Sequence, residues 1–360
     1  MAAVHQFVAG FSNGDAISNE AVAMRRLFRS WGYKSEVFSE TKRILPELRK
    51  QARDASLYAA ESRPDDTVLL HLSMGSPVNE IFRSLPCRKA ILYHNITPPD
   101  YFDLVNKQTA ANLARGRKQL QALASTAEVN MADSEFNASE LRELGFKDVK
   151  VLPLMLDLAR LRSTPDRKIL KRFDDGKINI LFVGRCAPNK KIEDLLRSFA
   201  FFNHFVDGNS RLVHVGSFAG TERYYYLLMA QARELGIENI HFAGAVPQAQ
   251  LNAFYECSSV FLCMSEHEGF CIPLIESMVH NLPVLAYAAG AVPETMAGSG
   301  VLVHEKRHDV IAEMIYKLAY DQHLRNAIIA GQQKRLAEYE AQDLEKDLQL
   351  HMAPLLSGTP

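Results

Sequence analysis

Two glutamates, Glu268 and Glu276, flank a glycine and a proline in the segment EGFCIPLIE, residues 268–276. Gly269 lets the backbone approach a ligand closely, and Pro273 suits the first turn of a helix. We therefore expect Glu268 in a loop and Glu276 inside the helix that follows. The amino end of a helix attracts phosphate, and carboxylates accept hydrogen bonds from sugar hydroxyls. The segment indicates a nucleotide-sugar site, although acidic residues near a helix start are also common for stability alone.

A second segment, VGRCAPNKKIEDLL (183–196), brings fixed positive charge to the end of another apolar run. Arg185 and Lys190 stand ahead of a helical pattern, together with Gly184 and Lys191. Cations of this kind bind a diphosphate, and each charge-assisted hydrogen bond contributes about 1.5 to 3 kcal/mol. Taken alone, the segment is equally typical of a charged surface loop. Because both loops belong to one predicted sheet edge, we interpret them as parts of the same site.

Short apolar runs alternate with segments of helical period, which is typical of parallel sheets with helices on both faces. The first series of predicted strands covers residues 4–10, 67–74, 90–96, 129–134 and 149–154. The second series covers residues 178–184, 211–216, 239–244, 259–265, 282–290 and 300–303. Ligands of such sheets bind at the carboxyl ends of the strands. We therefore expect an α/β protein with two Rossmann-like, doubly wound parallel-sheet domains that face a central cleft.

The predicted domain boundary lies in a polar stretch. Residues 157–176 contain Pro165 and show no strand pattern, so we predict the linker between the domains there. The first domain is expected at 1–158 and the second at 159–335. Residues 336–360 are expected to form a helix that packs back on the first domain.

The composition excludes several classes of protein. The chain has 360 residues, of which 47% are hydrophobic and 23% charged, as in ordinary packed proteins. The formal net charge of -1 provides no basic field that would attract nucleic acid. Five cysteines without a CxxC pair fit neither a disulfide framework nor a thiolate zinc site. No signal-peptide pattern and no long apolar window occur, so we expect a cytoplasmic protein.

At these motifs the chain resembles the retaining nucleotide-sugar glycosyltransferases of family 4, which have the two-domain GT-B fold. The segment 268–276 is similar to the family's E-x7-E element, and 183–196 to its phosphate-binding loop. Residues 290–303, GAVPETMAGSGVLV, are similar to the stretch after that element. Residues 134–146, SEFNASELRELGF, are similar to the end of the family's amino-terminal domain. The resemblance covers nearly the whole chain.

The resemblance implies a role for the residues of these loops. Arg185 and Lys190 would bind the donor diphosphate and stabilise its departure. Glu268 would hold hydroxyls of the transferred sugar, and Glu276 would accept both ribose hydroxyls. Glu294 is either a further donor ligand or only a loop carboxylate. The other implied donor-binding residues, which act mainly through their backbone, are Gly184, Gly269, Phe270, Cys271, Ile272 and Leu274.

Two positions depart from the family pattern. Cys271 and Lys191 stand where the family often has glycine. A side chain at Cys271 would narrow the sugar pocket, which leaves the donor open between GDP-mannose and a UDP-hexose.

Two segments of the first domain also match the family. The turn GFSNGDAIS (10–18) follows the first predicted strand, and its backbone near Gly14 and Asp15 would approach the donor phosphates or the acceptor. His94, in the segment YHNITPP, resembles the histidine that family members place beside the reacting sugar. A single histidine after a strand is also typical of a hydrogen-bonded structural residue. His71 has a similar position and a weaker match.

The resemblance implies a mechanism without a protein nucleophile. The acceptor hydroxyl would attack from the face of the leaving group, and the departing phosphate would take its proton. Because Arg185, Lys190 and the helix end supply positive charge, we expect no metal and no cofactor beyond the nucleoside diphosphate sugar, which is a co-substrate.

One short motif points to different chemistry. The segment HEKRH (304–308) matches the zinc protease pattern H-E-x-x-H. That chemistry requires both histidines on one face of a helix. Here they follow a predicted strand, and Asp309 is the expected cap of the next helix, so we interpret the segment as a loop.

These observations predict a metal-independent hexosyltransferase of polysaccharide biosynthesis. It would move a mannose- or glucose-type group from a GDP- or UDP-sugar to a hydroxyl of a saccharide or lipid-linked acceptor. Two alternatives stay open: a sugar-nucleotide epimerase or hydrolase of the same fold, and a non-catalytic sugar-nucleotide-binding protein. A dinucleotide dehydrogenase is disfavoured because the chain lacks a GxGxxG pattern.

The first helical region is rich in basic residues. They indicate either a peripheral contact with the inner face of a membrane or an ordinary solvated surface. These residues are Arg25, Arg26, Arg29, Lys34, Lys42, Arg43, Arg49, Lys50 and Arg53.

Overall fold

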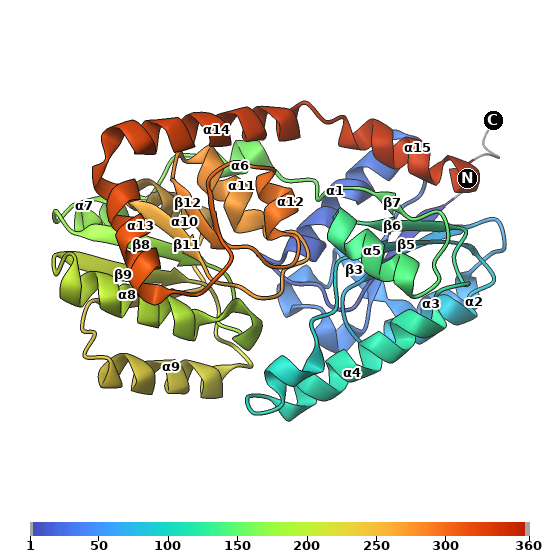
Figure 1. Cartoon of the computed structure of the whole chain (residues 1–360). Coiled ribbons are helices and arrows are strands. Elements are labelled where there is room, and N and C mark those ends of the chain that lie inside the picture. The colour runs from blue at the N-terminus through green and yellow to red at the C-terminus, as the bar shows by residue number, and fades with distance from the viewer. Residues whose placement is uncertain (1–2, 357–360) are drawn as a thin grey trace. The chain divides into compact units, whose positions relative to one another are not determined.

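The computed structural model describes residues 3–356, which form two compact units (Figure 1). The first unit comprises Met1–Asp100, Lys107–Leu156 and Asp343–Pro360, and the second comprises Tyr101–Asn106 and Asp157–Gln342. Residues 1, 2 and 357–360, at the ends of the expected domains, lie outside the described residues. Each unit is a parallel sheet with flanking helices, so the predicted α/β class with two parallel sheets is confirmed.

The sheet of the first unit has seven parallel strands in the order β3-β2-β1-β4-β5-β6-β7. Its strands are β1 (Val4–Val8), β2 (Val37–Ser39), β3 (Ala52–Asp54), β4 (Thr67–Leu72), β5 (Arg88–Tyr93), β6 (Val129–Ala132) and β7 (Lys150–Val151). Its helices are α1 (Ala16–Ser30), α2 (Ala55–Glu61), α3 (Pro77–Ser84), α4 (Lys107–Ala122), α5 (Glu135–Glu143) and α15 (Leu344–Leu356). The chain winds outward in both directions from the neighbouring strands β1 and β4.

Helix α1 illustrates why these segments fold as they do. Its apolar residues recur every three to four positions, and Ala21, Met24 and Phe28 are fully buried. Gly32 follows the helix with a left-handed backbone, φ 87°, which stops it as the sequence predicts. The period of the apolar residues therefore determined both the helix and its buried face.

Two strands of this sheet, β2 and β3, are absent from the sequence prediction. Each has only three residues, too few to form a recognisable apolar run. Strand β3 lies at the edge of the sheet, and Arg53 projects from it over the ring of Phe38, 5.3 Å from the centroid. Pairing with β1 and β2 makes these residues strands, and such tertiary pairing has no local signature.

The sheet of the second unit has six parallel strands in the order β10-β9-β8-β11-β12-β13. Its strands are β8 (Ile178–Val183), β9 (Ser210–Val215), β10 (Ile240–Gly244), β11 (Val260–Cys263), β12 (Val284–Tyr287) and β13 (Val301–Val303). Its helices are α6 (Leu158–Leu161), α7 (Arg167–Phe173), α8 (Ile192–Phe205), α9 (Glu222–Glu234), α10 (Gln248–Glu256), α11 (Ile272–Val279), α12 (Val292–Met296), α13 (His308–Tyr320) and α14 (Gln322–Glu340). All six strands fall within the predicted runs or within one residue of them.

The expected linker at 157–176 is instead part of the second unit. It contains helices α6 and α7, which pack on α10. The side chains of Asp157 and Asp166 accept hydrogen bonds from the first turns of these two helices. Asn252 Nδ2 donates to the Ser163 carbonyl at 2.9 Å. The two short helices were not predicted because this stretch is polar. The two aspartates, which are typical helix N-caps, could have indicated where the helices begin.

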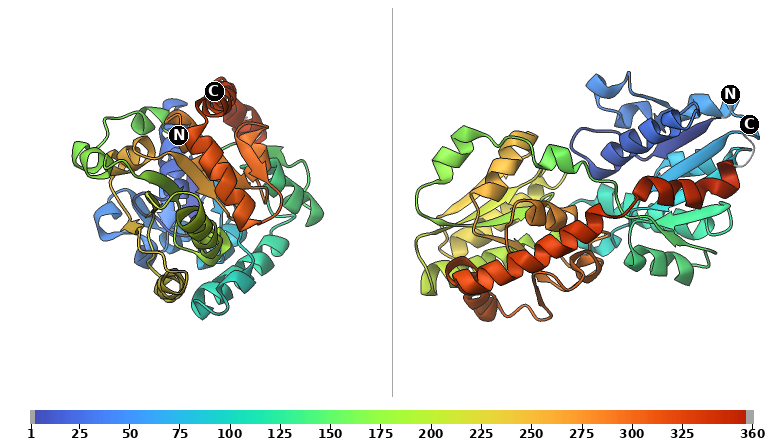
Figure 2. Two further views of the ribbon diagram at one scale, coloured as in Figure 1. Left: turned by 60° about the vertical axis from the view of Figure 1, so that its left-hand side comes forward. Right: turned by 90° about the horizontal axis from the view of Figure 1, so that it is seen from above.

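The final helices divide between the two units. Helix α14 continues to Glu340 within the second unit, so the returning helix, α15, begins at Leu344 and not at the expected 336. Figure 2 shows α15, in dark red, beside the strands of the first unit. Its apolar side chains Leu348, Met352 and Leu355 are buried in the core that includes Val4. Residues 344–356 therefore complete the core of the first sheet.

Candidate functional site

The loops after β8 and β11 meet where the strand order of the second sheet reverses. These two strands are neighbours, and such a switch point binds ligands at the carboxyl ends of its strands. Lys190 lies in the loop after β8 and Glu268 in the loop after β11, with Lys190 Nζ 2.5 Å from Glu268 Oε2. The structure therefore brings together two charged residues that the sequence assigned to one site.

The neighbouring Glu268 side chain determines the charge of Lys190. The Glu268 side chain is 8% exposed and the Lys190 side chain 21%. Burial by itself lowers the pKa of Lys190, but the Glu268 carboxylate outweighs burial and raises that pKa above its ordinary value. Lys190 therefore carries its positive charge at neutral pH.

Asn189, which the sequence analysis overlooked, joins the two loops. Its Nδ2 donates to the His267 carbonyl at 3.0 Å, and its own carbonyl accepts from the Glu266 N–H at 2.9 Å. Asn189 is buried between them. Its contacts fix the position of the Lys190 loop relative to the Glu268 loop. In the sequence, only its place directly before Lys190 could have indicated this role.

The backbone of Glu268 packs against the loop that follows β12. The Ala291 N–H donates to the Glu268 carbonyl at 3.0 Å. Gly290 has φ 56°, and a Cβ there would lie 2.6 Å from the Glu268 carbonyl oxygen and 2.9 Å from its nitrogen. No side chain fits so close an approach, so Gly290 is a positioning residue for Glu268.

Helix α11 begins directly after Cys271, as the motif predicts. The carbonyl of Cys271 accepts from the Leu274 N–H at 3.1 Å, so this N–H is engaged within the first turn and not held open for phosphate as expected. The Ile272 N–H stands at the helix start, where intrahelical acceptors are lacking. The preceding loop, with Gly269 and Phe270, is held by a hydrogen bond from Thr295 Oγ1 to the Phe270 carbonyl.

Glu276 lies inside α11 and pairs with Tyr255 of α10. The Tyr255 hydroxyl donates to Glu276 Oε2 at 2.5 Å, and its ring stacks on His280 with the centroids 5.1 Å apart. Burial raises the pKa of Glu276, and the hydrogen bond from Tyr255 opposes this effect only in part. The other carboxylate oxygen, Oε1, takes no part in this hydrogen bond.

Arg185 and Glu294 are both exposed side chains of the second unit. Arg185 follows Gly184 at the end of β8 and is exposed, and its Nη2 donates to the Ala219 carbonyl at 3.3 Å. Glu294 is exposed on the short helix α12. In this conformation a carbonyl of the loop after β9 accepts a hydrogen bond from the Arg185 guanidinium. That Arg185 converges with Lys190 on a diphosphate stays a prediction.

A charge network beside the pair was not predicted. Lys306 Nζ lies 2.7 Å from both Asp194 Oδ2 and Glu266 Oε1. Glu266 Oε2 accepts from the Tyr101 hydroxyl at 3.2 Å and lies 3.3 Å from Lys191 Nζ. Lys191 therefore has acidic partners of its own. These residues are scattered along the chain, so no spacing pattern could have grouped them.

In the first unit, Asp15 acts as a helix cap. Its Oδ2 accepts from the Ser18 N–H at 2.9 Å and from Ser18 Oγ at 2.7 Å, at the start of α1. Gly14, just before it, is exposed with φ 71°. That the backbone near these residues approaches a ligand stays a prediction.

His94 and His71 lie together at the carboxyl ends of β5 and β4. His71 Nδ1 is 3.0 Å from His94 Nε2, and His94 Nδ1 is 3.3 Å from Asp133 Oδ2. Burial lowers the pKa of His71. Burial alone would lower the pKa of His94. The carboxylates of Asp133 and Glu20 have the larger effect, so the pKa of His94 lies above its ordinary value. That His94 contacts a reacting sugar stays a prediction.

Comparison with known protein families identifies the second unit. Residues 164–335 match the family model described as glycosyl transferases group 1. These residues belong to the group 1 glycosyl transferases. The match contains both the loop of Lys190 and the loop of Glu268.

Two of the curated proteins similar to this chain are named as glycosyl-transferring enzymes. A D-inositol 3-phosphate glycosyltransferase of Segniliparus rotundus is 31% identical over 183 residues, 48% of this chain and 40% of that protein. A GDP-mannose-dependent alpha-mannosyltransferase of Mycobacterium tuberculosis is 31% identical over 172 residues, 45% of this chain and 41% of that protein. The chain spans less than half the length of the curated relatives it matches.

Solved structures share the fold of the whole chain. Sucrose-phosphate synthase from Thermosynechococcus elongatus has a TM-score of 0.77 at 14% identity, over 99% of this chain and 100% of that one. Anabaena HepE, solved in complex with UDP and glucose, has a TM-score of 0.73 at 16% identity, with both chains covered completely. The chain therefore has the GT-B fold.

Cys271 and Lys191, which stand where the family often has glycine, both have a left-handed backbone. Cys271 has φ 69° and Lys191 has φ 50°, and each stands directly before a helix of the site. Glycine adopts this conformation at no steric cost. The left-handed backbone at Cys271 and Lys191 explains why glycine would suit these two positions.

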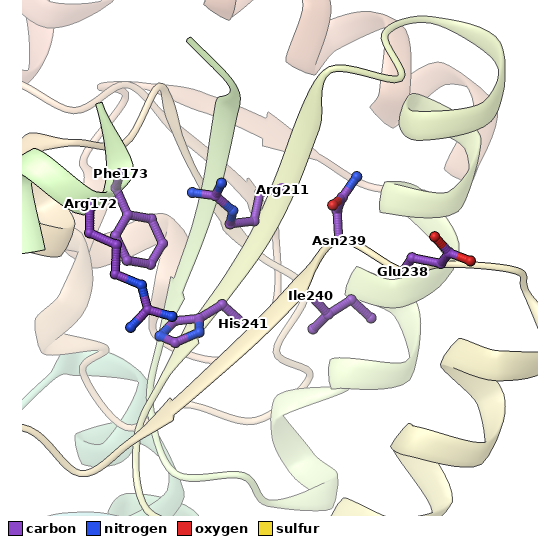
Figure 3. Close-up of a pocket in the computed structure, with 7 residues that line it drawn as sticks. All are labelled: Arg172, Phe173, Arg211, Glu238, Asn239, Ile240 and His241. Atoms are coloured by element: carbon purple, nitrogen blue, oxygen red, sulfur yellow. The ribbon is translucent and has the colours of Figure 1, made fainter. Parts of the chain in front are cut away.

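The second unit also has a pocket at the amino ends of its strands, on the side of the sheet away from the Lys190–Glu268 pair. It is lined by Arg172, Phe173, Arg211, Glu238, Asn239, Ile240 and His241 (Figure 3). Arg211 and Ile240 stand at the amino ends of β9 and β10, whereas the Lys190–Glu268 pair lies at the carboxyl ends of the strands. This pocket is therefore separate from the candidate site.

The zinc protease motif of residues 304–308 is not helical. His304 is exposed in a bend after β13, and His308 is the first residue of α13, with Nδ1 3.0 Å from Ser198 Oγ. Asp309, the expected cap, lies in the first turn and pairs with Arg307, which occupies the cap position. The two histidines therefore do not share a helix face.

The basic residues of the first helical region lie on several elements. They are spread over α1, the following turns and β3, and several are paired, for example Arg29 with Glu36 at 2.8 Å and Arg53 with Glu61 at 3.0 Å. Within residues 3–356, no helix has both the length and the apolar character needed to cross a membrane. Peripheral membrane contact stays a prediction.

Proposed function

We propose that this protein transfers a hexosyl group, with retention of anomeric configuration, from a nucleoside diphosphate sugar to a hydroxyl acceptor. The observation that carries the proposal is the Lys190–Glu268 pair at the switch point of a group 1 glycosyl transferase domain. A partly buried cation, a buried carboxylate and the start of α11 stand at the carboxyl ends of neighbouring strands. This combination suits a sugar diphosphate.

The proposed reaction breaks the bond between the anomeric carbon of the sugar and the donor diphosphate. Lys190 stabilises the negative charge that develops on the leaving diphosphate, and Arg185 does so once it turns from the Ala219 carbonyl. The acceptor oxygen bonds to the anomeric carbon on the same face, and its proton goes to the departing phosphate. Glu268 orients sugar hydroxyls through the oxygen that Lys190 does not bind.

The proposed donor is GDP-mannose, with UDP-hexoses as the runner-up. GDP-mannose is named for two curated relatives, which are 31% and 25% identical to this chain, whereas UDP is named for a solved structure at 16% identity. Glu276 would accept a ribose hydroxyl beside the hydrogen bond that it receives from Tyr255. This contact is common to both nucleotides, so it does not choose between them.

A thermal-shift panel of GDP- and UDP-sugars tests the donor. A ligand that binds only the folded protein raises Tm, and at a hundred times its Kd it adds about 2.7 kcal/mol to stability. We expect GDP-mannose to raise Tm more than UDP-glucose does. Glu276→Gln should reduce the shift with both, whereas Glu256→Gln, at the end of α10, should leave it unchanged. No shift with any sugar nucleotide would contradict the proposal.

The rate of nucleotide release separates transfer from the alternatives. A transferase releases GDP or UDP quickly only when a suitable acceptor is added, whereas a hydrolase releases it in buffer and an epimerase converts the sugar without releasing it. We expect release to rise with a mannoside acceptor. Fast release that is independent of acceptor would indicate a hydrolase.

Transfer is expected to survive chelation. The proposed counter-charge for the diphosphate is Lys190, which the protein itself supplies. EDTA at millimolar concentration should therefore leave the initial rate of transfer unchanged. If EDTA abolishes turnover and Mg²⁺ or Mn²⁺ restores it, the role proposed for Lys190 is wrong.

A further inference from the structure

The pocket at the amino ends of β9 and β10 gathers basic side chains around one aromatic ring. The guanidinium carbons of Arg211 and Arg172 lie 4.7 and 5.7 Å from the ring centroid of Phe173, the last residue of α7. The His241 ring meets Phe173 edge-on, with the centroids 5.2 Å apart. Figure 3 shows these four side chains in the pocket. Two guanidinium groups and one imidazole therefore line one small space.

Arg211 has a partner that balances its charge. Its Nη2 pairs with Asp175 Oδ2, and its Nη1 donates to Asn179 Oδ1 at 3.2 Å. These contacts hold the guanidinium over the Phe173 ring. Because a guanidinium has five N–H donors in a rigid fork, Arg211 offers its remaining N–H groups from a fixed position.

Arg172 has no such balance. Among residues 3–356, its guanidinium contacts the Phe173 ring but forms no ion pair or hydrogen bond, and His241 likewise has no hydrogen-bond partner. Glu238 also lines the pocket, but Figure 3 shows its carboxylate directed away from the two arginines. Arg172 therefore brings a positive charge that no carboxylate of the described lining neutralises.

His241 responds to this positive charge. Burial lowers its pKa below the ordinary value of 6.5, and the charges of Arg172 and Arg211 lower it further. The imidazole is therefore neutral at pH 7 when the pocket holds no anion. A bound anion would offset the effect of the two arginines, so the ring could take up a proton and become a third charged donor.

The size and the donors of the pocket favour a small phosphate-bearing anion. Its volume, about 190 Å³, is smaller than the roughly 300 to 1,000 Å³ typical of sites for drug-sized ligands, so a second nucleotide sugar would not fit. Guanidinium groups match the oxygens of phosphate in paired hydrogen bonds. We propose that Arg172, Arg211 and His241 bind a phosphate dianion, free or as a small monoester, at the end of the sheet opposite the candidate site.

A basic pocket of the first unit lacks these properties. Arg117 and Lys118 of α4 contribute to its lining. Arg117, however, already donates to Glu140 Oε1 at 2.5 Å and to the Ile96 carbonyl at 2.7 Å. Its charge is balanced and its donors are engaged, so we expect no phosphate binding there.

The pKa of His241, measured by NMR on the full chain, tests the proposal. His241→Gln identifies its resonance among those of the 12 histidines. Sulfate is the first probe because it stays doubly charged, whereas phosphate itself takes up a proton in the same pH range. At constant ionic strength, potassium sulfate in place of potassium chloride should raise the pKa of His241. Since a dianion favours the protonated ring, sulfate binding should tighten as the pH falls through this pKa.

Two exposed arginines of α7 give matched variants, and neither substitution should unfold the protein. Arg172→Gln should weaken sulfate binding at least about tenfold, the usual effect of losing one charge-assisted hydrogen bond, and should itself raise the pKa of His241. Arg167→Gln removes the same charge from the first residue of α7 and should leave both quantities unchanged. Equal effects of the two variants, or no response of His241 to sulfate, would overturn the proposal.

Inorganic phosphate and glucose 6-phosphate separate the two sources of the anion. Tighter binding of the sugar phosphate would assign the pocket to phosphate monoesters, and equal binding would assign it to free phosphate. No response of His241 to either compound would contradict the site. None of these readouts depends on glycosyl transfer, so they stand apart from the proposed function.

Discussion

Lys190→Met is expected to lower kcat/KM for glycosyl transfer by about 10²- to 10³-fold, the usual effect of removing one preorganised group that stabilises developing negative charge. Lys190 is the cation held against Glu268 at the switch point, and it keeps its charge because the Glu268 carboxylate raises its pKa. Initial rates of transfer over a range of donor concentrations measure the loss. Lys168→Met, which removes an exposed lysine of α7, should leave kcat/KM unchanged.

A double variant separates this catalytic effect from folding. Lys190→Met alone leaves the Glu268 carboxylate buried without its cation and should cost about 3 kcal/mol of stability. Adding Glu268→Gln removes that charge, so the free energy of unfolding should return towards the parent value. Activity should stay low in the double variant. Recovery of activity together with stability would show that Lys190 acts only as a structural partner of Glu268.

Gly290→Ala is expected to lower kcat/KM about 10²-fold, because misplacement of a positioned group by about 1 Å has an effect of this size. The added Cβ would stand 2.6 Å from the Glu268 carbonyl oxygen, so the Glu268 loop must move. The left-handed backbone of Gly290 adds a further cost of about 1 to 2 kcal/mol in stability. Transfer kinetics and denaturant unfolding measure the two effects.

Gly298→Ala is the matched control for this substitution. Gly298 also has a left-handed backbone, φ 80°, but a Cβ there meets no atom within 4 Å. Gly298→Ala should therefore lose about 1 to 2 kcal/mol of stability and keep its activity. Equal loss of activity in both variants would mean that the close approach of Gly290 to Glu268 does not position the carboxylate.

The sequence predicted most of the fold because buried parallel strands leave a strong local pattern. All strands of the second sheet were recognisable as apolar runs, since both faces of such strands are covered. The strands β2 and β3 were not, because three residues are too few to show a period. The helices α6 and α7 were hidden within a polar stretch, where only the capping residues Asp157 and Asp166 marked them.

The candidate site was predictable where its residues lie close together in the sequence. Glu268, Gly269, Cys271 and Glu276 share one strand–loop–helix segment, and the spacing alone placed them correctly in a loop and a helix. Contacts between distant segments were missed. Glu20 and Asp133 meet His94 only after four parallel strands are assembled, and neither stands in a motif that points to the other.

Side-chain direction was also beyond the sequence. Lys190 and Arg185 lie in one loop and carry the same charge, yet Lys190 turns to Glu268 and Arg185 to the Ala219 carbonyl. The buried carboxylate attracts the nearer lysine, and the exposed guanidinium takes a backbone acceptor. A charge pattern can therefore predict which loop binds an anion. It is less able to predict which of the cations in that loop makes the contact.

Helix α15 constrains the order in which the chain can fold during its synthesis. Trp31 Nε1 donates to Glu345 Oε1 at 3.0 Å across 314 residues, and Leu348 and Met352 fill the same core as Phe28. The amino-terminal sheet is made first, but this hydrophobic face stays open until residues 344–356 leave the ribosome. The second unit is complete before that point. We therefore expect the half of the protein that is synthesised first to reach its native core last.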